Sequence, residues 1–220
     1  MNEFDLVLPT AVDVREVGMR DGLQLEDPLP LYDKLALLEA LVATGVRRIE
    51  VTSFVSPRAV PALADADQLA AELHGFEGVH FSALVANPRG AVRAVDAGIA
   101  HLEYVVSASD SHSRANAGRP TAEAVAAVGE IAALAHGAGG SLEVIVATAW
   151  DCPFAPGASG NIATEELVYW LADAEVHTGI DLDAVLAAAA VTERAVGHEL
   201  PSSLYRAGGR SVPRGAVVPA

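Results

Sequence analysis

Three polar residues that can act on a small molecule stand close together near the N-terminus: Arg20, Asp21 and Gln24. They follow an apolar stretch, about residues 12–19, whose valines and methionine are typical of a buried parallel strand. In barrels of alternating strands and helices, the carboxyl ends of the strands form the active site. A carboxylate beside a guanidinium can hold a divalent cation next to a donor for a substrate oxygen. The alternative is a local ion pair that closes the strand.

Other candidate residues lie further along the chain. Glu50 stands within an apolar strand, where an unpaired carboxylate is costly to bury, so we expect a partner such as Arg20. Cys152 and Asn161 flank a loop rich in glycine and proline. A lone cysteine is most often a small buried hydrophobe, and an isolated asparagine is often a turn residue, so for these two both interpretations stay open.

The elements that must position these side chains follow from periodicity. Apolar runs predict five strands, at about 12–19, 48–54, 79–85, 101–108 and 142–148. Helical spacing predicts four helices between them, at about 31–44, 63–73, 89–97 and 121–136, the last capped by Thr121. Alternating strands and helices predict an α/β protein with a parallel sheet.

The alternation stops after Trp150. Residues 151–161 form a loop, and helices are predicted at about 163–174 and 181–196, with no sixth buried strand. A closed barrel of this type needs eight strands and typically ~250 residues. The sequence therefore predicts a TIM-type β/α barrel that is incomplete, with five strand–helix units plus C-terminal helices, in a single domain over 1–220.

Composition limits the partners. The net charge of −15 argues against nucleic acid and anionic membranes. No apolar run reaches the ~18 residues that span a bilayer. Acidic residues near the N-terminus and the lack of a basic leader predict a cytoplasmic location. The single cysteine excludes an internal disulfide.

Four stretches together resemble the hydroxymethylglutaryl-CoA lyase family: E-V-G-M-R-D-G-L-Q, I-E-V-T-S-F-V-S-P, C-P-F-A-P-G-A-S-G-N-I-A-T-E-E-L-V-Y and H-T-G-I-D-L. Their length and order cover nearly the whole chain. The resemblance implies a metal-dependent β/α barrel that cleaves 3-hydroxy-3-methylglutaryl-CoA (HMG-CoA) to acetyl-CoA and acetoacetate. It also implies Mg²⁺ or Mn²⁺ as the cofactor and an acyl-CoA as the substrate.

The resemblance assigns roles to matched positions. It implies that Asp21 and Asn161 bind the metal. Arg20 neutralises the developing enolate and contacts substrate with Gln24, and Glu50 orients Arg20 and the metal. Cys152 corresponds to the cysteine of a catalytic loop, and Glu165 to an acid that supports the site from behind the ligands.

The chain departs from the family pattern at two points. The His-x-His pair that supplies two metal ligands is missing, and the seven histidines are all isolated: His74, His80, His101, His112, His136, His177 and His198. The motif C-P-F occurs once where the family has two copies of C-P-[FY]. We therefore infer a deletion junction near residues 150–156, which removes three barrel strands.

These observations predict an HMG-CoA lyase with a weakly held metal and impaired activity. The alternatives are a non-catalytic remnant or interaction protein with the same fold, and a related acyl-CoA lyase or aldolase. The missing strands leave strands one and five as edges, which predicts a homo-oligomer unless later residues cover one of them.

Overall fold

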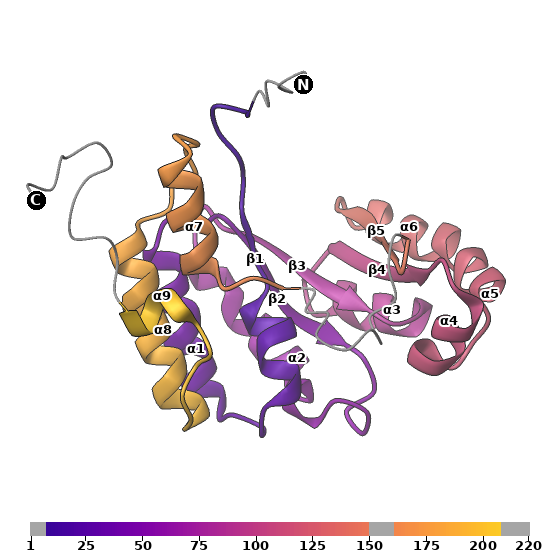
Figure 1. Cartoon of the computed structure of the whole chain (residues 1–220). Coiled ribbons are helices and arrows are strands. Elements are labelled where there is room, and N and C mark those ends of the chain that lie inside the picture. The colour runs from indigo at the N-terminus through magenta and orange to yellow at the C-terminus, as the bar shows by residue number, and fades with distance from the viewer. Residues whose placement is uncertain (1–7, 150–160, 208–220) are drawn as a thin grey trace, which may run out of the picture.

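The computed structural model describes residues 8–149 and 161–207, and its framework is one curled parallel sheet (Figure 1). The strands follow chain order, β1-β2-β3-β4-β5, and every neighbouring pair is parallel. Their bounds are Arg15–Glu16, Arg48–Phe54, His80–Val85, His101–Ser107 and Ser141–Ala147. The predicted incomplete β/α barrel is confirmed.

Helices pack on the outer side of this sheet and beside β1. They are α1 (Leu31–Ala43), α2 (Ala66–Glu72), α3 (Pro88–Asp96), α4 (Asp110–Ala117), α5 (Thr121–Ala126), α6 (Val128–Gly137), α7 (Thr164–Asp173), α8 (Leu182–Val196) and α9 (Ser203–Ala207). Short helical turns lie at η1 (Gly18–Gly22), η2 (Leu23–Leu25), η3 (Pro61–Leu63) and η4 (Leu73–Gly75). Among the described residues, no helix is long and apolar enough to cross a membrane.

The core lies between the sheet and the helices that pack on its outer side. Ile49 and Val51 of β2, Leu38 of α1 and Ile131 of α6 are fully buried there. Ile49 and Val51 alternate with Glu50, because neighbouring residues of a strand point to opposite faces of the sheet. The helix-facing side of β2 is therefore apolar, whereas the inner face carries a buried acid.

The first strand differs from its prediction. Only Arg15 and Glu16 pair with β2, and the predicted end of the strand winds into η1. The amides of Arg20 and Asp21 donate to the carbonyl of Val17, at 3.0 and 2.6 Å, so they point along a helical turn and not across a ladder.

The predicted helix at 121–136 is two helices, α5 and α6, separated at Ala127. Thr121 does not cap α5, because Pro120 occupies the N-cap position and the Thr121 hydroxyl donates to the Ser107 carbonyl at 3.0 Å. Asn87 does act as a cap: its side chain accepts from the amide of Gly90 at 2.9 Å and begins α3.

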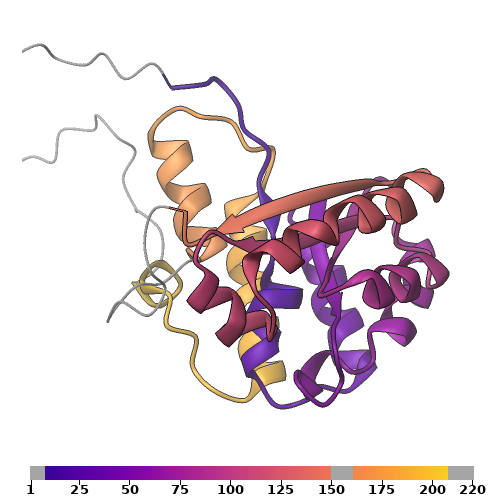
Figure 2. The same ribbon diagram turned by 90° about the vertical axis from the view of Figure 1, so that its right-hand side faces the viewer.

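The two edges of the sheet, at β1 and at β5, have different neighbours. Beside β1, the chain pairs with the segment after α7: the amide of Val12 donates to the His177 carbonyl at 2.9 Å, and the His177 amide to the Thr10 carbonyl at 3.0 Å. Figure 2 shows β5 along the outer edge of the sheet. Within the described part of the chain β5 has no second strand partner, and Val144 and Val146 are exposed on it.

We expect this open edge to cause self-association. An exposed apolar edge strand offers unpaired backbone groups to another chain, and a lysine on such an edge suppresses pairing. Val146→Lys should therefore shift the protein toward monomer in light scattering at micromolar concentration. Val125→Lys on α5 is the matched control, because Val125 is 53% exposed and Val146 is 56% exposed. A sharply monomeric wild-type profile contradicts the prediction.

Candidate functional site

A contact made by two hydrogen bonds joins η1 to β2. The Arg20 guanidinium donates from Nε and Nη2 to the two carboxylate oxygens of Glu50, both at 2.8 Å. The Glu50 side chain is 1% exposed and that of Arg20 is 14% exposed. This two-point geometry fixes the plane of the guanidinium more firmly than a single bond does. The buried partner predicted for Glu50 is confirmed.

The Asp21 carboxylate accepts hydrogen bonds from three residues. Gln24 Nε2 donates to its Oδ1 at 2.7 Å, and Arg20 Nη1 donates to the same oxygen. Asn161 Nδ2 donates to Oδ2 from a position 140 residues along the chain. These contacts bring together Arg20, Asp21, Glu50 and Asn161, the four residues to which the resemblance gives roles around one metal and substrate.

Burial and charge oppose one another in this cluster. Burial raises the pKa of Glu50 to about 7, although Arg20 acts in the opposite direction. Burial also disfavours the Arg20 cation, but its bonds to Glu50 outweigh that effect and raise the pKa of Arg20. The site therefore contains a firmly charged guanidinium beside a carboxyl group that can change protonation near neutral pH.

A second polar group lies on the inner face of the sheet and was not predicted. Arg15 of β1 donates to both oxygens of Glu143 on β5, at 2.9 and 2.5 Å, and lies 3.0 Å from a Glu103 oxygen. Ser82 Oγ donates to the same Glu103 at 2.6 Å. The only sequence signal is that each charged residue stands within an apolar strand; nothing in the sequence indicates which of them meet.

Glu16 was also missed, although it opens the first motif. Its carboxylate accepts from the Gly18 amide and from the Thr164 hydroxyl, each at 2.6 Å. These bonds connect the turn that carries Arg20 to the first residue of α7. Glu16 therefore holds the turn that carries Arg20 next to the start of α7.

Residues 11–156 match the family model described as HMGL-like, which covers more than half of the chain. The chain belongs to the HMGL-like family. A hydroxymethylglutaryl-CoA lyase of Bacillus subtilis is 27% identical over 287 residues, covering 88% of this chain and 96% of that protein. An (R)-citramalyl-CoA lyase of Chloroflexus aurantiacus is 31% identical over 301 residues, covering 90% and 95%.

A solved structure extends the likeness to the fold. An HMG-CoA lyase from Acinetobacter baumannii, in complex with coenzyme A and 3-methylmalate, has a TM-score of 0.76 at 25% identity and covers 100% of both chains. The named relatives are lyases, so this HMGL-like chain is an enzyme by family. The aligned spans of 287 and 301 residues exceed the 220 residues here, so the relatives contain internal residues without a counterpart. The predicted junction at 150–156 lies outside the described residues.

The metal expected for an HMGL-like lyase does not fit the ligands that the structure describes. In residues 8–149 and 161–207, no three histidine, cysteine, aspartate or glutamate side chains lie close enough to hold an ion. Both oxygens of Asp21 already accept N–H donors, and Asn161 presents its nitrogen to Asp21. One carboxylate and one amide leave a divalent cation mostly hydrated and weakly bound. Weak metal binding therefore stays a prediction.

Of the two remaining predicted site residues, Cys152 is outside the described residues. Glu165 is buried on α7, and within the described chain it makes no hydrogen bond or ion pair with Arg20, Asp21 or Asn161. Of the isolated histidines, His80 and His101 begin β3 and β4, as predicted, with ring centroids 4.0 Å apart.

The raised pKa of Glu50 predicts a pH dependence of stability. Between its ordinary value of 4.5 and about 7, the folded state holds a proton that the unfolded chain releases. The free energy of unfolding should therefore fall as pH rises through this window, by up to about 1.4 kcal/mol per pH unit. Urea titrations from pH 4.5 to 8 should show that Glu50→Gln removes this part of the slope.

The control is Glu39→Gln, since Glu39 is an exposed acid on α1. The lowered pKa values of Asp110 and Glu143, caused mainly by their hydrogen bonds, give slopes of opposite sign at lower pH. The quantity to compare is therefore the difference in slope, free energy of unfolding against pH, between each variant and the wild type. Equal slopes for Glu50→Gln and wild type contradict the prediction.

Proposed function

We propose that this chain carries the substrate-binding part of an acyl-CoA carbon–carbon lyase, with HMG-CoA as the first candidate substrate, and that its turnover is impaired. The observation that carries the proposal is the Arg20–Glu50 pair. The guanidinium has five N–H donors, and three of them are engaged by Glu50 and Asp21. One N–H on each terminal nitrogen is left to meet a substrate oxygen.

The chemistry needs a cation at that position. In the cleavage, a base takes the proton of the C3 hydroxyl, the C2–C3 bond breaks and its electron pair moves onto the acetyl-CoA fragment. The ketone is acetoacetate, and the enolate of acetyl-CoA then takes up a proton. Arg20 donates to the oxygen on which negative charge accumulates, and preorganised donors of this kind usually supply the largest part of catalysis. Glu50 holds Arg20 in place.

A related acyl-CoA is the second candidate substrate. The (R)-citramalyl-CoA lyase that resembles this chain at 31% identity supports it. Both HMG-CoA and citramalyl-CoA are thioesters with a hydroxyl group on C3 of the acyl chain. In both, the carbon–carbon bond next to that hydroxyl group is cleaved. Arg20 is suited to the oxygen of either, so the acyl group must be distinguished by experiment.

Calorimetric titration separates these functions from a non-catalytic remnant. The wild type should bind HMG-CoA more tightly than it binds coenzyme A alone. Arg20→Gln should weaken HMG-CoA binding roughly tenfold or more, because a hydrogen bond from a charged group is lost. Arg58→Gln is the control, since Arg58 is an exposed arginine. Equal affinities for the two ligands, or an unaffected Arg20→Gln, would favour the interaction-protein alternative.

A further inference from the structure

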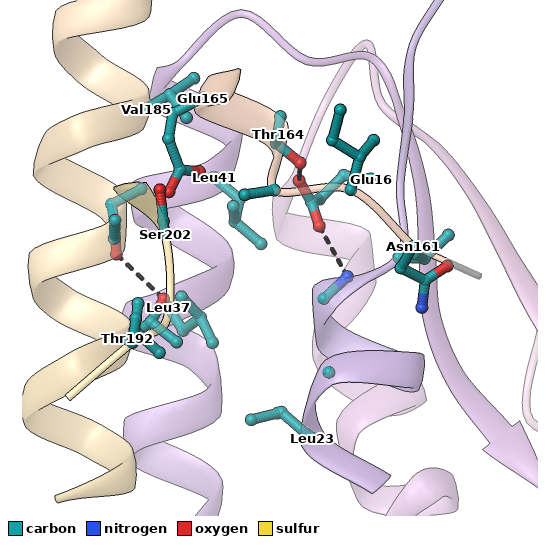
Figure 3. A pocket seen from close by; sticks show the side chains of 18 of the residues that line it. Glu16, Leu23, Leu37, Leu41, Asn161, Thr164, Glu165, Val185, Thr192 and Ser202 are labelled. Carbon is teal, nitrogen blue, oxygen red and sulfur yellow. Dashed lines mark hydrogen bonds between the residues drawn. The ribbon is translucent and has the colours of Figure 1, made fainter. Parts of the chain in front are cut away.

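A cavity of about 600 Å³ lies between the turn after β1 and the paired helices α1 and α8. Figure 3 shows its walls: Leu23 comes from η2, Leu37 and Leu41 from α1, and Val185 from α8. Residues 161–167 and 200–202 close it on the remaining sides. Its size is that of a pocket for a small organic molecule. Arg20, Asp21 and Glu50 do not line it.

Glu165 gives this largely apolar cavity a specific polar feature. It projects from α7 beside Ser202 in Figure 3, and it is only 6% exposed. Within the described chain, its carboxylate has no hydrogen-bond or ion-pair partner, whereas Glu16 on the opposite wall has two donors at 2.6 Å. The carboxylate oxygens are open to the cavity and have no donor among the described residues, so a molecule that brings a donor is favoured there.

The charges around the cavity favour one sign of charge on the bound molecule. Arg15, the arginine of the wall, is already paired with Glu103 and Glu143, and the His198 ring lies 2.8 Å from a Glu26 oxygen. Glu16 and Glu165 therefore leave an excess of negative charge in a space that is otherwise mostly hydrocarbon. An anionic ligand would meet two acids, and a neutral alcohol would leave the charge of Glu165 unbalanced.

We propose that this cavity binds a small organic ammonium ion, with its N–H donors on Glu165 and its hydrocarbon part against α1 and α8. The ammonium supplies both the positive charge and the donors that Glu165 lacks. The apolar part buries its surface against Leu37, Leu41 and Val185, and removing that surface from water stabilises the complex. The proposal does not depend on lyase activity.

Three probes of similar shape and different charge test the proposal: cyclohexylammonium, cyclohexanol and cyclohexanecarboxylate. In calorimetric and thermal-shift titrations of the full chain at low ionic strength, the ammonium should bind saturably and raise the melting temperature. The alcohol should bind at least roughly tenfold more weakly, and the carboxylate should not bind. Comparable effects of the three probes, or no saturable binding of the ammonium, overturn the proposal.

Glu165→Gln retains the shape of the side chain and removes its charge. It should weaken cyclohexylammonium binding roughly tenfold or more, whereas Glu130→Gln, at an exposed acid of α6, should leave the affinity unchanged. If Glu165→Gln does not fold, Ala188→Leu provides the second test, because it narrows the cavity from α8 and should also reduce binding. Unchanged affinity in a folded variant of either kind contradicts the site.

Discussion

Purified protein should release acetoacetate from HMG-CoA at least about 10²- to 10³-fold more slowly than the full-length Bacillus subtilis relative under the same conditions, with Mg²⁺ or Mn²⁺ added. Removing one preorganised electrostatic donor costs about that factor. This chain has no His-x-His pair, to which the family resemblance assigns two ligands of the expected metal. Among the described residues, the candidate metal ligands are Asp21 and Asn161, and the Asn161 amide donates a hydrogen bond to the Asp21 carboxylate. Arg20 and Glu50 form their ion pair, but they do not replace the positive charge of a metal ion.

Paired variants make the turnover measurement decisive. Asp21→Ala should leave the already low rate almost unchanged, and so should Asp27→Ala, which alters an exposed acid nearby. Robust metal-dependent release of acetoacetate that Asp21→Ala abolishes, while Asp27→Ala does not, contradicts the prediction. That result would mean that residues outside the described ranges, or a second chain, complete the metal site.

The sequence predicts most of the sheet because parallel strands are buried on both faces. The run Arg48–Phe54 was predicted with its observed bounds, since six of its seven residues are buried and Ile49, Val51 and Phe54 give it an apolar pattern. The first strand was overextended, because Met19 is equally apolar but is buried from a helical turn between Gly18 and Gly22. Burial alone does not distinguish the two conformations over so short a stretch.

The candidate site was predictable to the extent that chain neighbours and buried charges determine it. Arg20 and Asp21 are adjacent, and a glutamate inside an apolar strand needs a partner, so the Arg20–Glu50 pair follows from the sequence. The contact between Arg15 and Glu143 joins residues 128 apart and depends on how strongly the sheet curls. No local pattern contains that curvature, so the contact could not be predicted.

Arg15→Met should lower the free energy of unfolding by roughly 3–5 kcal/mol, measured by urea denaturation at pH 7. Arg15 stands on β1 and pairs with acids of β4 and β5, so it bridges the first and last strands of the sheet. Its hydrogen bond to Glu143 raises the pKa of Arg15 and lowers that of Glu143, as expected for a persistent ion pair. Methionine fills the space but leaves Glu103, which is 2% exposed, without its cation.

Three further variants separate the charge effect from a loss of packing. Arg47→Met, at an exposed arginine next to β2, should change stability by less than about 0.5 kcal/mol. Glu143→Gln should have a small effect, since that side chain is 50% exposed and water replaces the partner. The double variant Arg15→Met/Glu103→Met should recover much of the loss, because replacing a buried ion pair with apolar side chains is often neutral. If the double variant is as unstable as Arg15→Met, the loss comes from packing, and the curl of the sheet does not depend on this bridge.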